Sequence, residues 1–208
     1  MARQQAEIRR EEILRAAATV VARKGFARTR VADVAAELGI SAGLVFYHFD
    51  SKERLLSEAF ALASDRDLDA MDAAIAGPGH YADRLRNVMR LYQRISPESA
   101  DLEVWSSNID AWAEGRYTDE IREVVRRNDA RWRQGLTKLV TAGVEAGEFS
   151  CPDAEEAALR ICVMLDGLAV ATQVRGTLSR GRAKVWADEH AARELGLPVP
   201  VQLPPAQR

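Results

Sequence analysis

The chain has little of several residue types, and each shortage excludes a class of protein. Its 208 residues include only two cysteines, Cys151 and Cys162, which argues against a disulfide framework and favours a reducing compartment. No apolar run approaches the roughly 20 residues that span a bilayer, and the amino-terminal segment lacks the apolar core of a signal peptide. We therefore expect a cytoplasmic protein that makes no membrane contact.

The residues of most catalytic and metal sites are also scarce or badly spaced. The three histidines, His48, His80 and His190, lie far apart without metal-ligand spacing, so we expect no metal and no other cofactor. We find no nucleophile–base–acid set and no glycine-rich phosphate loop with a lysine. An all-α enzyme is therefore the weaker alternative, and no catalytic residue is predicted.

Charge is distributed unevenly along the chain. Residues 1–30 hold eight lysines and arginines against three acidic residues, a local charge of +5. Because the whole chain carries −2, the remainder carries −7. A basic end on an acidic body is typical of a protein whose one end binds a polyanion. A solvated helix with many charges would give the same composition.

Helical periodicity covers most of the chain, and no stretch alternates as a strand does, so the predicted fold class is all-α. Gly77-Pro78-Gly79 is the clearest break, and four of the seven prolines lie beyond residue 195. We expect helices over the following ranges: 8–24, 31–38, 42–49, about 51–71, 80–95, 99–114, 118–147, 154–176 and 181–195. The tail from 196 to 208 is expected to be extended or disordered.

The second and third of these helices are joined only by Gly39-Ile40-Ser41. Two short helices joined by a three- or four-residue turn with a glycine form a helix-turn-helix, in which the second helix enters the DNA major groove. Ala35 is small where the helices would cross, and Ser41 can cap the second helix. An ordinary helical hairpin in an all-α protein has the same spacing.

Three stretches near the amino terminus carry a family resemblance: "EEILRAAATVVARKG", "GFARTRVADVAAELGIS" and "VFYHFDSKERLL". Through them, residues 7–66 resemble the DNA-binding domain of the tetracycline-repressor (TetR) family of transcriptional regulators. The resemblance implies a three-helix helix-turn-helix domain. It also implies a helical effector-binding and dimerisation domain, here residues 67–195. By resemblance the protein is a homodimeric regulator, most often a repressor, that binds double-stranded DNA at a palindromic operator.

The resemblance also implies which residues contact DNA. Phosphate contacts fall on Thr29, Tyr47, His48 and Lys52, whose side chains can donate to phosphate oxygens, and Ser41 lies at a helix amino terminus that favours an anion. Base contacts fall at the start of the third helix, on Ala42, Gly43 and Leu44. None of these three has a side chain that can make the hydrogen bonds that distinguish bases.

Three positions depart from the family pattern: Phe46 replaces a frequent tyrosine, Arg30 replaces a threonine or serine, and Ala32 replaces a longer side chain. We therefore expect Arg28 or Arg30, together with DNA shape, to supply part of the specificity. In the third helix we expect Val45 and Phe49 to face inward. Tyr47, His48 and Lys52 are expected to face outward, although His48 beside Phe49 can also be a packed side chain.

Two predicted helix faces within residues 67–195 have the composition of a small-molecule site. One carries Leu85, Val88, Met89 and Tyr92, and the other sets Asn108 between Trp105 and Trp112. Pockets are mostly apolar with a few polar groups, but such stripes more often face a core. The complete predicted effector set, to which the resemblance adds weight, is Met89, Tyr92, Trp105, Asn108, Trp112, Asn128, Trp132 and Gln173. The sequence does not distinguish an aromatic box that binds a cation from a site that binds a planar hydrophobic molecule.

Residues 157–174 are apolar around most of a helix, as expected for a helix buried between its own domain and a partner subunit. By resemblance the last two helices form the dimer interface. Asp166 interrupts the run, either as a satisfied buried acid, as a cross-dimer partner or as a ligand contact. A regulator without an inducer, whose body only dimerises or binds another protein, remains the second functional hypothesis.

Overall fold

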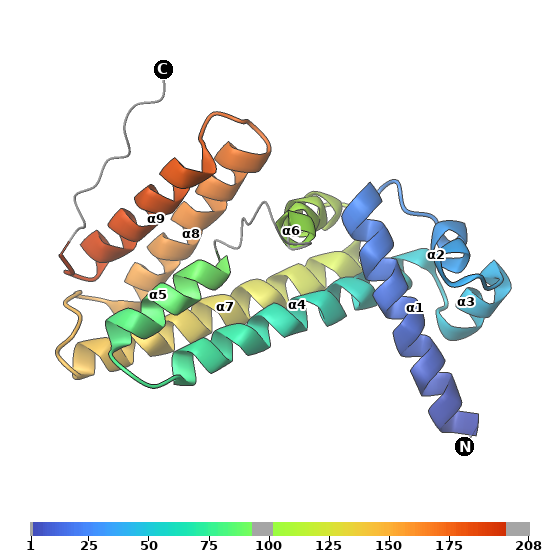
Figure 1. Cartoon of the computed structure of the whole chain (residues 1–208), viewed down its shortest axis with the longest axis horizontal. Helices are drawn as coiled ribbons and strands as arrows, with labels where there is room; N and C mark the ends of the chain where they lie inside the picture. The colour runs from blue at the N-terminus through green and yellow to red at the C-terminus, as the bar shows by residue number, and fades with distance from the viewer. Residues whose placement is uncertain (1, 93–101, 199–208) are drawn as a thin grey trace. The chain divides into compact units, whose positions relative to one another are not determined.

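The computed structural model describes residues 2–92 and 102–198, and the side chains of residues 4–91 and 108–198. Within these ranges the chain forms helices and no strands (Figure 1), which confirms the all-α prediction. The helices are α1 (Ala2–Lys24), α2 (Val31–Leu38), α3 (Ala42–His48), α4 (Lys52–Ala76), α5 (Tyr81–Tyr92), α6 (Leu102–Glu114), α7 (Asp119–Glu145), α8 (Ala154–Gln173) and α9 (Arg180–Glu194).

The ends of the first helices follow from local backbone chemistry. Gly25 ends α1 with φ +79° and Gly39 ends α2 with φ +63°, conformations in which a side chain is strained. The Ser41 hydroxyl accepts from the Leu44 backbone N–H at 3.2 Å and so caps α3. Ser51 does the same for α4, accepting from the Arg54 N–H at 3.0 Å. These ends agree with the predicted ones.

The chain divides into two compact units, which are described separately. The first comprises residues 1–67 and 97–128, and the second comprises residues 68–96 and 129–208. The first boundary lies close to the predicted one at 66. However, Ala111 of α6 and Ile121 of α7 are buried in the core of the first unit, although both had been assigned to the carboxy-terminal domain. The division by function into residues 7–66 and 67–195 stays a prediction.

The core of the first unit fixes the three amino-terminal helices on the start of α4. α2 packs on α1, and α3 packs on α2 (Figure 1). The rings of Phe26 and Phe60 meet edge to face with centroids 5.7 Å apart. The other large, fully buried side chains of this unit are Ile13, Val20, Val34, Phe49, Leu55 and Ile121. Their burial is the main stabilising term for the platform on which α3 is presented.

The core of the second unit is built around the neighbouring helices α8 and α9 (Figure 1). Leu195 is fully buried, and the Leu197 N–H donates to the Ala192 carbonyl at 2.8 Å. Leu197 also packs against this core. Leu197 has no regular secondary structure, but it is packed and not disordered, because apolar burial continues past the end of α9. Residues 199–208 of the predicted tail lie outside the described residues.

Candidate nucleic-acid interface

The helix-turn-helix is built by α2, the turn Gly39-Ile40-Ser41 and α3. The axes of the two helices bend by 106° at this turn, within the 90–120° range typical of the motif. The Ile40 N–H donates to the Ala35 carbonyl at 3.0 Å, which ties the turn to α2. Val34, Ala35 and Val45 form its buried centre. The short loop and this small core together hold α3 at a fixed angle.

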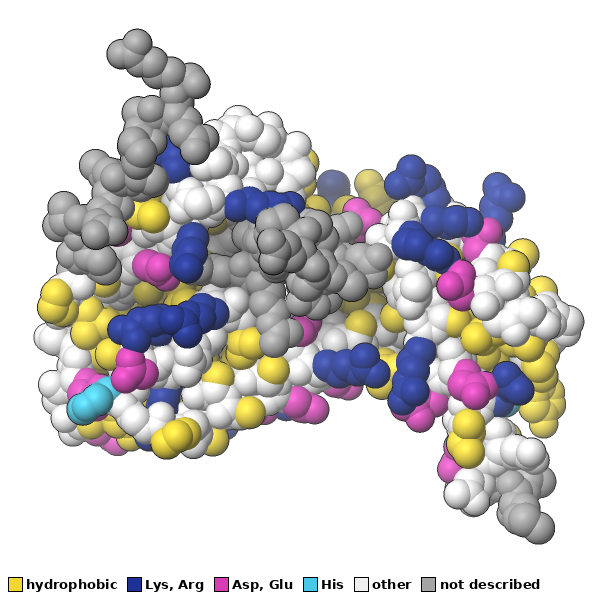
Figure 2. Space-filling model, in the orientation of Figure 1, with side chains coloured by type: hydrophobic (Ala, Val, Ile, Leu, Met, Phe, Trp, Pro, Cys, Tyr) yellow, Lys and Arg dark blue, Asp and Glu magenta, His cyan; other side chains and the backbone are white. Residues whose placement is uncertain are grey.

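The outer surface of α3 is exposed and its inner surface is buried. Val45 and Phe49 are 1% and 2% exposed, whereas Phe46 and Tyr47 are 51% and 79% exposed. Figure 2 shows hydrophobic side chains gathered over this region of the surface. His48 and Lys52 are partly exposed. The division of the stretch into inward and outward residues is thus as predicted, and Phe46 belongs to the outward set.

Thr29 corrects the predicted set of phosphate contacts. Its side chain is 0% exposed, and its hydroxyl donates to the Gly25 carbonyl at 2.8 Å. A hydroxyl that is buried and already donating cannot reach a phosphate. Thr29 instead closes the turn between α1 and α2, because it satisfies a carbonyl at the end of α1 that has no helical partner.

Most of the positive charge near the amino terminus is neutralised within the first unit. Of the seven cationic side chains described between residues 4 and 30, five form ion pairs with carboxylates: Arg9 with Glu12, Arg10 with Glu58, Arg15 with Glu11, Arg23 with Glu37 and Lys24 with Asp33. Arg28 and Arg30 form none with any described carboxylate. Between residues 4 and 30, the cations left for a polyanion are therefore Arg28 and Arg30, in the turn before α2.

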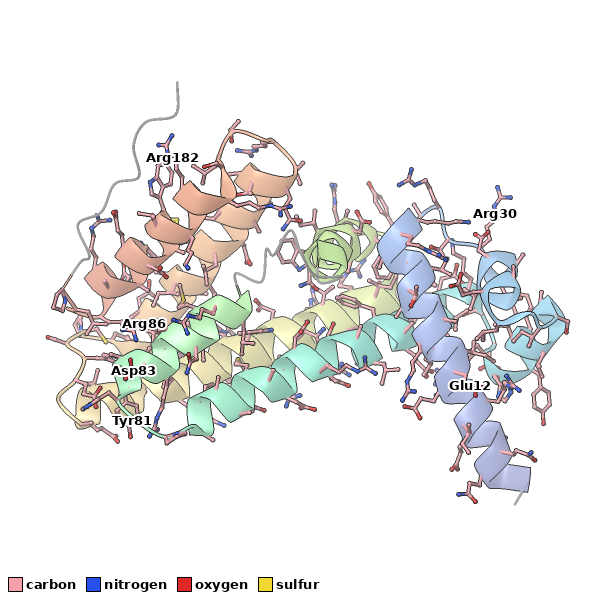
Figure 3. All side chains as sticks on the ribbon, viewed as in Figure 1. Glu12, Arg30, Tyr81, Asp83, Arg86 and Arg182 are labelled. Atoms are coloured by element: carbon pink, nitrogen blue, oxygen red, sulfur yellow. The ribbon has the colours of Figure 1, made fainter. Side chains whose placement is uncertain are left out.

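Asp33 shapes the backbone that presents Arg30. Its carboxylate pairs with the Lys24 ammonium at 2.8 Å and accepts from the Arg30 backbone N–H at 3.0 Å. The Lys24 hydrogen bond, and then that from Arg30, hold the pKa of Asp33 below its usual value. The residue therefore stays ionised at neutral pH and fixes the first turn of α2. The Arg30 side chain extends outward from this point (Figure 3).

Sequence reasoning missed Asp110 of α6, which lies against the turn that carries Arg28. A hollow of about 220 Å³ is lined there by Gly25, Arg28, Asp110, Glu114 and Tyr117, among others. A Cβ added to Gly25 would lie 2.7 Å from the Asp110 Oδ2. Burial raises the pKa of the Asp110 carboxyl, and Arg28 offsets part of this rise. The signal in the sequence is a carboxylate among apolar residues of a helix, which indicates a partner without identifying Gly25.

The predicted effector residues are divided between the two units. Met89 is buried in the core of the second unit, Trp132 packs against it, and Gln173 is partly exposed at the end of α8. Asn108 and Trp112 lie on α6 in the first unit and are partly exposed. Asn128, also of the first unit, is 9% exposed, and its Nδ2 has no hydrogen-bond partner. The side chains of Tyr92 and Trp105 lie outside the described residues.

Two further findings concern membrane-spanning helices and metal sites in the described ranges. No single helix there is long and apolar enough to cross a membrane. Only α2 and α3 taken together, across a bend of 106°, have the necessary length and apolar composition. The same ranges contain no group of three or more histidine, cysteine or acidic side chains placed to hold a metal ion.

Comparison with known proteins adds independent information on the whole chain. Residues 13–71 match the family described as bacterial regulatory proteins, tetR family, and residues 81–196 match the family described as BetI-type transcriptional repressor, C-terminal. The HTH-type transcriptional regulator BetI of Stenotrophomonas maltophilia is 28% identical over 178 residues, 84% of each chain.

Solved structures show the same similarity. A transcriptional regulator from Saccharomonospora viridis in complex with choline is 27% identical, with a TM-score of 0.81 over 91% of this chain and 98% of that one. A TetR-family regulator from a Rhodococcus species is also 27% identical, with a TM-score of 0.72 over 86% and 94% of the two chains. The similarity therefore extends well beyond the helix-turn-helix.

Proposed function

Because this chain belongs to the TetR family of bacterial transcriptional regulators, we propose that it is a repressor that binds a palindromic operator as a homodimer and is released by a small molecule. The observation that best supports DNA binding is the way in which α3 is presented at the surface. Its inner side chains are buried, its outer side chains are open to solvent, and its angle to α2 is fixed by a short capped turn. A helix presented in this way can enter a major groove.

Phosphate contacts are proposed for the polar groups at the edges of this surface. Lys52 opens α4, while Arg28 and Arg30 precede α2, where one of them keeps its proposed part in the specificity. The rings of Tyr47 and His48 meet edge to face with centroids 5.2 Å apart, which holds two further donors at the end of α3. Ser41 contributes the amino-terminal end of α3. Contacts of this kind fix the register of a protein on the duplex and supply affinity for any sequence.

Replacing Lys52 with alanine is expected to weaken binding to every DNA sequence by a similar factor, because the lost charge contacts phosphate. The slope of log affinity against log salt should become shallower by about one unit. Titrations of operator and random duplexes between about 50 and 200 mM salt measure both effects. Lys138→Ala, which removes an exposed lysine of the second unit, is the matched control. An unchanged salt slope would place Lys52 away from the phosphates.

Dimerisation through α8 and α9 is supported by apolar residues left in contact with solvent. Leu159, Val163 and Val174 are 36%, 61% and 62% exposed, and their spacing places them on one stripe of α8 and its carboxy-terminal cap. On α9, Trp186 is 41% exposed beneath the Arg182 guanidinium; Figure 3 labels Arg182. We propose that a second copy of the chain covers this surface through a two-fold axis. Such a dimer can contact two half-sites about 34–36 Å apart.

The proposed effector is a small quaternary ammonium compound of the choline type. The support is the choline complex of the similar Saccharomonospora viridis regulator and the match to BetI-type repressors. In this chain, Trp112 on α6 is partly exposed and can offer the face of its ring to a cation. The buried Asn128 Nδ2 lacks a partner, a costly state that a ligand oxygen would relieve.

Choline and its neutral carbon isostere 3,3-dimethylbutanol test this effector class. Choline should raise the thermal midpoint with increasing concentration and release the protein from its operator. The isostere, which has the same shape without the charge, should do neither. Equal effects of the two compounds would favour an apolar pocket over a cation box. No effect of either would exclude the choline class, while the DNA-binding proposal would be unaffected.

A further inference from the structure

The outer surface of α3 is poor in the groups that distinguish bases by hydrogen bonds. Its first turn carries Ala42, Gly43 and Leu44, and Phe46 follows on the exposed side. The Ser41 oxygen at the start of this turn is occupied in capping by the Leu44 N–H, and the hydroxyl that α3 itself carries is that of Tyr47, one turn further on. Guanine and adenine are normally recognised by bidentate side chains such as arginine, asparagine or glutamine. None of these occurs in α3.

Two apolar residues of this surface, Leu44 and Phe46, are not among the side chains packed on the core of the first unit. Ala42 packs against that core, whereas Leu44 is partly exposed and does not belong to the set of apolar side chains packed on it. Phe46 is 51% exposed. Leu44 and Phe46 are two positions apart, about 200° around the helix axis, so they border the exposed face of α3 on its two sides. Gly43 and the 79% exposed Tyr47 lie between them.

Gly43 leaves open space on the same surface. A Cβ added there would meet nothing closer than the Ser41 Oγ at 3.8 Å, and the residue has no positive φ. Neither packing nor backbone conformation therefore requires glycine at this position, although glycine inside a helix costs about 0.5–1 kcal/mol relative to alanine. The absence of a side chain allows the backbone of α3 to approach a partner closely.

The feature of the major groove that is complementary to an apolar surface is the C5-methyl group of thymine. We infer that α3 recognises its operator through thymine methyl groups contacted by Leu44 and Phe46, with Gly43 allowing the helix to lie deep in the groove. This inference rests on the proposed function, because it needs α3 to enter the major groove. Tyr47 and His48, in the second turn, then position the helix on phosphates while the apolar residues distinguish the bases.

Uracil provides the direct test, because it presents the same hydrogen-bonding groups as thymine and lacks only the methyl. The full chain first selects an operator from random duplex DNA. The operator is then resynthesised with deoxyuridine at the thymines of the half-sites. Affinity should fall about fourfold for each contacted methyl, from the transfer free energy of one buried methylene-sized group. Deoxyuridine placed in the flanking sequence is the matched control and should have no effect.

The outcomes separate this inference from the proposed function. Failure to select any sequence would contradict the proposed function itself. Selection of an operator that binds equally well with uracil throughout would overturn the methyl inference and leave the proposed function standing. Loss of affinity on deoxyuridine substitution in the half-sites alone would support both.

Protein variants assign the effect to α3. Leu44→Ala and Phe46→Ala should each reduce the ratio of thymine-operator to uracil-operator affinity toward one at the positions that they contact. Lys52→Ala should lower both affinities and leave the ratio unchanged, since a phosphate contact does not distinguish the bases. Thermal unfolding establishes that each variant is folded. If both apolar variants keep the full ratio, the methyl groups are contacted from elsewhere and the inference is wrong.

Discussion

Replacing Val163 with lysine is expected to leave each subunit folded and to reduce operator affinity about a hundredfold or more. Val163 is 61% exposed, whereas Ile161 and Cys162 beside it are 1% and 7% exposed, so a lysine at 163 does not enter the core. In a two-fold dimer the same surface meets its own copy. The new charge would be buried without a partner there, which is strongly destabilising for an interface.

The size of the effect comes from the loss of the second half-site. Two linked DNA-binding units bind more tightly than one by about 10²–10⁴, because the second contact is intramolecular. A monomer loses this factor although its helix-turn-helix is unchanged. Sedimentation equilibrium and operator titration, performed on the same preparation, measure the two parts of the prediction.

Ile8→Lys is the matched control for Val163→Lys. Ile8 lies on α1 and is 53% exposed, so the variant makes the same chemical change on a surface that the proposed dimer does not use. It should sediment as the wild type does. A Val163→Lys protein that stays dimeric would show that the exposed stripe of α8 is not the interface.

The helix boundaries set by glycines and serine caps could be predicted because their causes are local, whereas α1 begins at Ala2 and not at 8, and α4 continues to Ala76 and not to about 71. Gly25 and Gly39 end helices through positive φ, and Ser41 and Ser51 begin them through hydroxyl caps. Gly77-Pro78-Gly79 directly follows the last residue of α4. Each signal acts within four residues of its own position, so it can be recognised without knowledge of the fold.

The charge of the interface could not be predicted, because it depends on contacts between distant residues. Arg10 pairs with Glu58 and Arg23 with Glu37, separated by 48 and 14 residues. The local charge of +5 counted these arginines as available for DNA, and the fold removes them from that set. The prediction that Thr29 contacts a phosphate failed for a similar reason. Its residue type suits a phosphate, but its buried position does not.

The sequence also could not predict that α6 packs in the first unit. Periodicity establishes which face of a helix is apolar, but not which other helix covers that face. Ala111 is buried in the first core, and Asp110 lies against Gly25 of the turn after α1. The stripe of aromatic residues on α6 was predicted as an effector surface. Asp110 and Ala111 lie outside that stripe and support the helix-turn-helix, and the effector role of Asn108 and Trp112 stays a prediction.

Phe46 and Phe49 are three residues apart, and replacing Phe49 with alanine is expected to lower stability strongly, whereas replacing Phe46 is expected to leave it almost unchanged. Phe49 is 2% exposed, and its ring lies 4.7 Å below the Arg10 guanidinium. Phe49→Ala should lower the free energy of unfolding by about 3–5 kcal/mol, or roughly 10 °C in thermal midpoint for a chain of this size. Phe46→Ala removes an exposed ring and should change stability by less than about 0.5 kcal/mol.

Both variants should bind the operator less well, for reasons that the thermal midpoint separates. Phe49→Ala loses the anchor that holds α3 on the core, so its DNA affinity and its thermal midpoint fall together, and Phe49→Leu should restore part of each because it refills most of the volume. Phe46→Ala keeps the wild-type midpoint and loses only a contact at the DNA surface. Circular dichroism melts and operator titrations of the three proteins measure these differences. A stable Phe49→Ala protein beside an unstable Phe46→Ala protein would mean that the inner and outer surfaces of α3 are reversed, and the assignment of Leu44 and Phe46 to thymine methyl groups would fall with it.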